Sequence, residues 1–158
     1  MDSTQPKLRS YLLAGLFIFL FCSASFFLTR LDRAAASPSS LTGLAALREL
    51  AQQSVPYESA LSNGKPTLVE FYANWCTSCQ SLAPIMSKFH EQYDSRVNFV
   101  MLNVDEPQGR QRIEQYQVKG VPQFFFMRPD GRVIKTLVGG VPEPILGDLF
   151  KQLVSPTS

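Results

Sequence analysis

The sequence predicts an α/β domain, in which helices cover both faces of a mixed central sheet, preceded by one N-terminal transmembrane helix. Two observations support this prediction. Residues 10–29 form an uncharged apolar run, and from residue 67 onward short β-rich runs alternate with helical runs. The composition is that of a folded chain, because 45% of the 158 residues are hydrophobic and only 18% are charged.

The charge distribution argues against a nucleic-acid partner. The chain has 15 basic and 13 acidic residues, which gives a formal charge of +2. The whole excess lies in residues 1–53, because residues 54–158 hold equal numbers of basic and acidic side chains. That larger part has no basic run of the kind that binds nucleic acid. We therefore expect no nucleic acid among the partners.

Residues 10–29 predict a membrane anchor, with residues 1–9 as a short tail. Twenty helical residues at about 1.5 Å each span roughly 30 Å, the thickness of a bilayer core. The run is longer than the apolar core of a signal peptide, which has about 7–15 residues. A small-residue stretch that could be cleaved, Ala34–Ala36, lies beyond Arg33. We favour an uncleaved anchor that places the following domain across the membrane, and a cleaved signal peptide is the alternative.

Residues 30–54 predict a linker that contains a short helix. Small and polar residues with a proline and a glycine fill residues 34–43. Leucines then recur every three residues up to Leu50, which indicates a helix over Leu44–Gln53. This helix is either a stalk or a helix that packs on the domain. The domain itself is expected over residues 55–155.

The elements of the domain follow from its apolar pattern and its turn signals. A helical turn is expected over Tyr57–Leu61, ended by Asn63-Gly64. The expected strands are Thr67–Ala73, Val97–Val104, Gln123–Met127 and Arg132–Val138. The expected helices are Cys76–Tyr93, Gly109–Tyr116 and Glu143–Val154. The Asp130-Gly131 pair predicts the hairpin that joins the last two strands.

Cys76-Thr77-Ser78-Cys79 lies between the first predicted strand and the helix that follows it. At a helix N-terminus the free N–H groups and the dipole stabilise a thiolate, so the pKa of the first cysteine should fall. The thiolate is the form that attacks a disulfide. We therefore expect Cys76 to form a mixed disulfide and Cys79 to resolve it. The same exchange also runs in reverse, so the direction stays open.

Other interpretations of the cysteine pair are weaker. A zinc site needs four ligands, and the chain adds only Cys22, within the predicted anchor, and His90. A structural disulfide that closes so short a loop would stabilise the fold little. We expect neither a metal nor an organic cofactor.

Three further positions are candidates for the same chemistry. Glu70 lies in the middle of an apolar strand, where burial would raise the pKa of its carboxyl and let it take a proton from Cys79. A glutamate that faces water is the alternative. Pro122 lies directly before a strand, where a proline is unfavourable, and a cis bond between Val121 and Pro122 would let backbone groups there pair with a substrate. Trp75 is either a contact surface or a packed side chain.

Together these residues resemble the thioredoxin family over roughly residues 55–155. The resemblance rests on LVEFYANWCTSCQ (Leu68–Gln80), Ala83-Pro84-Ile85, Gly120-Val121-Pro122, Pro129-Asp130-Gly131 and Val138-Gly139. It implies a thioredoxin-like fold and a thiol–disulfide oxidoreductase. Cys76 would be the attacking cysteine, Cys79 the resolving one and Cys76–Cys79 the redox-active disulfide. It also implies that Pro122 is the cis-proline and that Glu70 stands where the family carries a buried acid, usually aspartate.

Two departures from the family pattern bear on the direction of the reaction. Thr77-Ser78 replaces the Gly-Pro pair of cytosolic thioredoxins, and Met101 stands where a lysine usually neighbours the buried acid. Neither Thr77 nor Ser78 is basic, unlike the residues between the cysteines of the oxidising members. This favours a reductant. The alternatives are an oxidant or isomerase that donates its disulfide, and a tethered binding or assembly factor without turnover.

The apolar segment, the approach Ala60–Pro66 and Glu70 are together similar to the membrane-anchored thioredoxin-like proteins of cyanobacteria and plastids. This resemblance implies a single-pass protein of the thylakoid or plasma membrane, in contact with lipid through residues 10–29. Its domain would face the lumen or periplasm. A membrane thiol transporter would supply the electrons, and the substrates would be proteins with disulfides or thiols, such as c-type cytochrome precursors.

Overall fold

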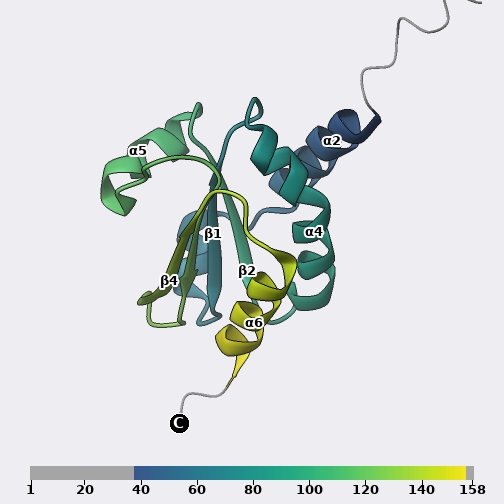
Figure 1. The fold of residues 1–158 in the computed structure, drawn as a ribbon. Helices are drawn as coiled ribbons and strands as arrows, with labels where there is room; N and C mark the ends of the chain where they lie inside the picture. The colour runs from purple at the N-terminus through teal and green to yellow at the C-terminus, as the bar shows by residue number, and fades with distance from the viewer. Residues whose placement is uncertain (1–37, 156–158) are drawn as a thin grey trace, which may run out of the picture. The chain divides into compact units, whose positions relative to one another are not determined.

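The computed structural model describes the backbone of residues 38–155 and the side chains of residues 42–155. The helices are α2 (Pro38–Gln53), α3 (Tyr57–Ser62), α4 (Thr77–Tyr93), α5 (Pro107–Tyr116) and α6 (Glu143–Val154). The strands are β1 (Thr67–Tyr72), β2 (Asn98–Asn103), β3 (Gln123–Met127) and β4 (Val133–Val138). Figure 1 shows their arrangement. From β1 onward the order of elements is the predicted one, and the α/β fold class is confirmed.

The four strands form one mixed sheet in the order β2-β1-β3-β4. β1 and β2 are parallel, whereas β3 is antiparallel to both β1 and β4. The register pairs Phe71 with Gln123, and Gln123 with Val138. The last residues of β1, β2 and β4 and the first residue of β3 therefore lie at one end of the sheet. We call this end, with the loops that leave it, the cysteine end.

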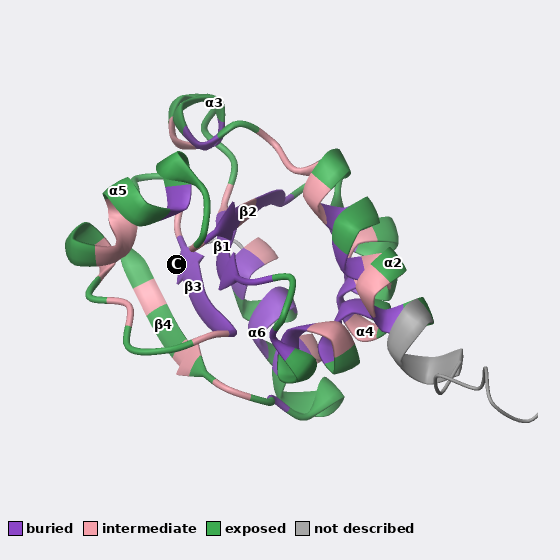
Figure 2. Ribbon diagram, turned by 90° about the horizontal axis from the view of Figure 1, so that it is seen from above, coloured by how far each residue is buried: buried purple, intermediate pink, exposed green. Residues whose placement is uncertain are grey.

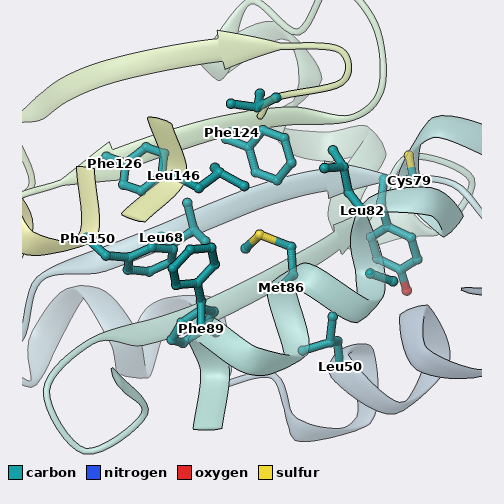
Figure 3. Close-up of a cluster of buried hydrophobic side chains, with 14 of the residues drawn as sticks. Leu50, Leu68, Cys79, Leu82, Met86, Phe89, Phe124, Phe126, Leu146 and Phe150 are labelled. Carbon is teal, nitrogen blue, oxygen red and sulfur yellow. The ribbon is translucent and has the colours of Figure 1, made fainter. Parts of the chain in front are cut away.

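Helices cover both faces of the sheet, so that the fold has three layers (Figure 2). On one face, α2, α4 and α6 bury a large cluster that includes Leu68, Met86 and Phe150. Figure 3 shows this cluster, with Cys79 at its edge. On the other face, α3 and α5 cover a second cluster around Phe71 and Phe125. Because side chains alternate along β1, adjacent residues of this strand enter different clusters.

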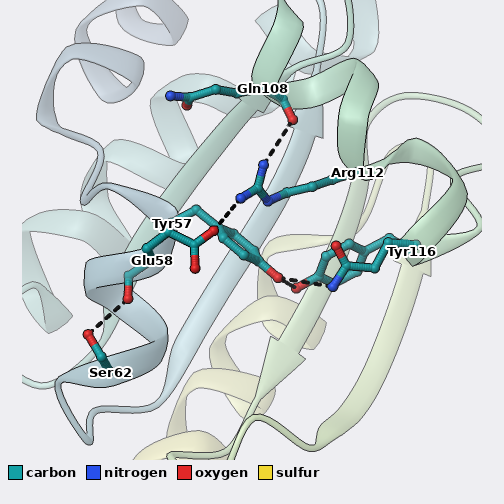
Figure 4. Close-up of polar contacts among 7 residues, drawn as sticks. Tyr57, Glu58, Ser62, Gln108, Arg112 and Tyr116 are labelled. Atoms are coloured by element: carbon teal, nitrogen blue, oxygen red, sulfur yellow. Dashed lines mark hydrogen bonds and ion pairs between the residues drawn. The ribbon is translucent and has the colours of Figure 1, made fainter.

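Polar contacts hold α3 against α5 (Figure 4). The hydroxyl groups of Tyr57 and Tyr116 lie 2.8 Å apart, and either can donate. The guanidinium of Arg112 lies over the Tyr57 ring, 4.0 Å from its centroid, and forms an ion pair with Glu58. The expected helical turn over Tyr57–Leu61 is thus fixed on the face of the sheet opposite α4.

The helix predicted within the linker is longer than the leucine pattern indicates. It begins at Pro38 rather than Leu44, and it packs along α4, where Leu47 and Leu50 are fully buried. A Cβ atom on Gly43 would lie 2.5 Å from the carbonyl oxygen of Gln80. Only a glycine allows so close an approach to α4. The structure therefore includes α2 in the same folded unit as the sheet, and this unit begins before residue 55.

The predicted transmembrane helix over residues 10–29 lies outside the described residues. Within residues 38–155, none of the helices has the length and apolar character needed to cross a membrane.

Candidate active site

Cys76 and Cys79 form a disulfide at the start of α4, with their Cα atoms 5.3 Å apart. Cys76 is the N-cap of this helix, and its Sγ accepts a hydrogen bond of 3.1 Å from the backbone N–H of Cys79. The first turn of α4 contains no acidic residue. Free N–H groups and the positive end of the helix dipole therefore face the sulfur of Cys76, an environment that lowers the pKa of a thiol.

The two sulfurs differ in their access to solvent. Cys76 is 5% exposed and Cys79 is fully buried. A substrate that approaches from solvent therefore meets Cys76 first. Cys76 lies in the loop that follows the C-terminal end of β1, and its N–H donates a hydrogen bond of 3.1 Å to the carbonyl of Ala73 in the same loop.

Glu70 is buried in the centre of β1, with 1% of its surface exposed. It lies between Leu68 and Tyr72, which both belong to the cluster that contains Cys79, so it faces the α4 side of the sheet. Its Oε2 atom is buried without a hydrogen-bond partner. Burial raises the pKa of this carboxyl from 4.5 to about 8. The predicted burial of Glu70 is observed, and its role as a proton acceptor stays a prediction.

The neighbours of Glu70 across the sheet are apolar. The register places Met101 of β2 on one side of Glu70 and Phe124 of β3 on the other. No ion pair within residues 42–155 involves Glu70. Met101, which stands where the family usually has a lysine, therefore places no positive charge beside the carboxylate. Desolvation by burial is the cause that raises the pKa of Glu70.

The peptide bond between Val121 and Pro122 is cis, as the family resemblance implies. Pro122 is buried directly before β3, and its carbonyl accepts a hydrogen bond of 2.8 Å from the N–H of Gly139. Because the first residue of β3 lies at the cysteine end, Pro122 belongs to the same end as Cys76. In the described part of the chain, no group bonds to the backbone N–H or C=O of Val121.

Trp75 is the most exposed large hydrophobic side chain of residues 42–155, at 66%. Its Nε1–H donates a hydrogen bond of 2.9 Å to Asp105, so the exposed ring is held by a polar contact. The ring is therefore not packed in the core, and a role of Trp75 as a contact surface stays a prediction.

Sequence reasoning missed Asp105 as a member of this group. The signal was its place directly after the second predicted strand. The C-terminal ends of neighbouring parallel strands meet at one edge of a sheet, so Asp105 had to lie near the residues that follow β1.

His90 lies away from the cysteine pair, in the last turn of α4, and its ring contacts that of Phe99 with centroids 4.8 Å apart. Cys22 lies outside the described residues. Within those residues, no three His, Cys, Asp or Glu side chains are grouped so that they could hold a metal ion.

Comparison with known proteins shows which family the chain belongs to. The family model described as Thioredoxin matches residues 48–152. The chain belongs to the thioredoxin family. A thioredoxin from Halobacterium salinarum, solved as a point mutant, superposes with a TM-score of 0.55 at 29% sequence identity. The superposition covers 63% of this chain and 84% of that one. The thioredoxin-like fold implied by the sequence resemblance is thus confirmed.

The chain is also similar to curated thioredoxin-family proteins. It is 46% identical over 113 residues to the chloroplastic thioredoxin-like protein HCF164 of Oryza sativa, a match that covers 72% of this chain and 43% of that protein. It is 41% identical over 109 residues to the thiol:disulfide interchange protein TxlA homolog of Synechocystis sp., covering 69% and 61%. The chain thus matches less than two thirds of the length of these relatives.

Proposed function

We propose that this chain is a membrane-anchored protein-disulfide oxidoreductase that reduces disulfides in protein substrates on the non-cytoplasmic side of a membrane. One observation carries the proposal. A disulfide between Cys76 and Cys79 lies at the N-terminus of α4, at the sheet end where Pro122 and Trp75 also lie. The printed name of the Synechocystis relative, a thiol:disulfide interchange protein, supports the same chemistry.

The reaction starts from the reduced pair. The Cys76 thiolate attacks one sulfur of the substrate disulfide, and the other substrate sulfur leaves as a thiolate. Cys79 then loses its proton and attacks the Sγ of Cys76. The bond between Cys76 and the substrate breaks, and the second substrate sulfur leaves as a thiolate that takes a proton from water. The substrate gains two electrons, and the cysteine pair loses two as it becomes a disulfide.

Glu70 is the proposed acceptor of the Cys79 proton. Its carboxyl is buried on the face of the sheet that α4 covers, and its pKa is raised to about 8. A base with a pKa near the working pH holds a useful fraction of its carboxylate form and also binds the proton readily. Buried Cys79 has no direct access to water, so an internal base is needed for its deprotonation.

Trp75, Val121 and Pro122 form the proposed substrate surface. Trp75 offers an exposed aromatic face beside the attacking sulfur. The backbone N–H and C=O of Val121 can pair with an extended substrate segment in the manner of a β-strand. Side-chain selectivity would then come from the aromatic surface rather than from charge.

The anchor, direction and partners rest on the sequence. The apolar run over residues 10–29 supports a single-pass protein of the thylakoid or plasma membrane, with its domain in the lumen or periplasm. The neutral Thr77-Ser78 pair favours a reductant. A membrane thiol transporter would restore the reduced pair, and c-type cytochrome precursors are candidate substrates. The chloroplastic name of the rice relative accords with a thylakoid protein.

Trapping of the mixed disulfide tests this function directly. In Cys79→Ser the second attack is impossible, so substrates should remain bound to Cys76 and appear as adducts on non-reducing gels. Cys76→Ser/Cys79→Ser is the matched control and should give none. A Cys79→Ser protein without adducts contradicts the assigned roles. If the double variant sustains function in cells, the chain is a binding factor instead.

A further inference from the structure

The loop between α5 and β3 carries Val121, whose backbone N–H and C=O are free to pair with a substrate. Backbone hydrogen bonds fix both ends of this loop. At its start the N–H of Val118 donates to the carbonyl of Ile113 at 2.9 Å, and at its end the carbonyl of Pro122 accepts a hydrogen bond of 2.8 Å. These bonds leave residues 119–121, which lie between them, to be held in some other way.

Packing contributes little to the conformation of residues 119–121. Lys119 and Gly120 are exposed, and Val121 is half-buried. Among the described residues, no atom beyond its chain neighbours would lie within 4 Å of a Cβ atom on Gly120, so the backbone there is surrounded by open space. Glycine also has more backbone freedom than any other residue. This segment therefore depends on hydrogen bonding to keep one conformation.

One side chain supplies the hydrogen bond that the segment needs. The Oε1 atom of Gln123 accepts a hydrogen bond of 2.8 Å from the backbone N–H of Lys119. Within residues 42–155, it is the one hydrogen bond that the backbone of residues 119–121 makes. Because a backbone N–H can only donate, it is the carbonyl oxygen of the Gln123 amide that must face Lys119. Gln123 thus ties the loop to the first residue of the strand that follows it.

The surroundings of Gln123 favour this contact. Its side chain is buried, with 3% of the residue exposed, and it lies on the same face of β3 as Phe125. Its partners in the neighbouring strands are Phe71 and Val138, whose side chains have no polar group. A buried acceptor that loses its partner pays the cost of its desolvation. Conformations of the loop that break the hydrogen bond to Lys119 are therefore unfavourable.

We propose that Gln123 is a positioning residue that holds Val121 in the orientation in which its backbone binds an extended substrate segment. A loop that is ordered in advance binds with a smaller loss of conformational entropy than a loop that the substrate must order. Gln123 acts through Val121 and takes no part in the exchange of sulfur bonds. This inference rests on the proposed function, because it needs the backbone of Val121 to bind the substrate.

Reduction of two different disulfides by Gln123→Met tests the inference. Methionine keeps the length of the side chain and removes the acceptor oxygen. In single turnovers of the reduced protein, the rate constant for an extended disulfide-containing peptide should fall about fivefold, as expected for one lost hydrogen bond. The rate constant for bis(2-hydroxyethyl) disulfide should stay within about twofold of the wild type, because this compound has no peptide backbone to pair with Val121.

Two controls separate positioning from a general loss of structure. Gln117→Met makes the same substitution in the same loop, at an exposed side chain. Thr67→Val removes the hydroxyl of a buried residue at the opposite end of β1 from the cysteines. Both variants should keep the wild-type ratio of the two rate constants, even where Thr67→Val lowers stability.

Two results would overturn the inference. The first is an unchanged rate constant for the peptide in Gln123→Met. The second is an equal fall for both disulfides, which would place the defect at Cys76 or in the fold as a whole. Failure of the proposed function would look different, because the wild type itself would then reduce neither disulfide.

Discussion

At the scale of single residues, Glu70 is the one acidic or basic side chain that is buried within residues 42–155. A carboxyl with 1% exposure, one unpartnered oxygen and apolar neighbours across the sheet is costly to ionise. The fold therefore stabilises its protonated form. A leucine at this position would stabilise the fold more than a glutamate does. A role of Glu70 in proton transfer would explain why this position carries a carboxyl in spite of its cost to stability.

The raised pKa of Glu70 predicts how stability depends on pH. Between pH 4.5 and about 8 the folded protein keeps a proton that the unfolded chain has released. Stability is thus fully present below pH 4.5, falls as the pH rises and levels off above about 8. At about 1.4 kcal/mol per pH unit, the total loss is about 5 kcal/mol.

Denaturant unfolding of the oxidised protein across this pH range measures the effect. In Glu70→Gln the loss should disappear, because the side chain does not titrate. The control Glu91→Gln changes an exposed glutamate of α4 and should keep the wild-type slope. An equal slope in Glu70→Gln and the wild type would show that other groups cause it.

Single residues also show what sequence can and cannot predict. The positions of Cys76 and Cys79 at the start of a helix were predictable, because they depend on the chain immediately around them, whereas the cis bond before Pro122 followed only from the family resemblance. Asp105 was not predicted in this way, because its contact with Trp75 depends on the register of β1 and β2. The burial of Glu70 was predictable only in part. Alternation along β1 predicts which residues share a face of the sheet with Glu70, but it does not predict which helices cover that face.

At the scale of elements, α2 is the part of the fold that departs most from expectation. The sequence around Pro38 resembles a linker because proline and serine are common in loops, yet both are also favourable in the first turn of a helix. The leucine pattern predicted a helix and left open whether it packs on the domain, and the burial of Leu47 and Leu50 shows that it does. The leucine spacing of α2 could not identify α4 as its packing partner, because the spacing within one helix does not specify which helix packs against it.

The packing of α2 on α4 predicts that α2 stabilises the domain. Leu47→Ala removes a fully buried side chain and should lower the free energy of unfolding by about 2–5 kcal/mol. Arg48→Ala, an exposed position on the same helix, should change it by less than about 0.5 kcal/mol. Denaturant unfolding of both variants checks this. Equal stability of Leu47→Ala and the wild type would mean that α2 is detached from the domain in solution.

At the scale of the whole molecule, the sheet topology gathers the site. The cysteine pair, Pro122 and Trp75 are separated by up to 47 positions in the sequence, but β1 and β3 run antiparallel and bring their loops to one end. The order of strands and helices predicts the fold class and a mixed sheet, whereas the strand order β2-β1-β3-β4 comes from the structure. α2 packs on α4, the helix at whose N-terminus the two cysteines lie. The first helix of the domain therefore contacts the helix that carries the redox-active pair.

The reduction potential of the Cys76–Cys79 pair shows whether this protein reduces or oxidises its substrates. It should be measured on residues 38–158, which retain α2, by equilibration with thiol buffers and thiol trapping. Our account predicts a value near that of thioredoxin, about −270 mV, as a reductant requires. A value of roughly −180 to −120 mV would contradict the proposed direction and indicate an oxidant or isomerase. A pair that does not titrate would contradict disulfide exchange altogether.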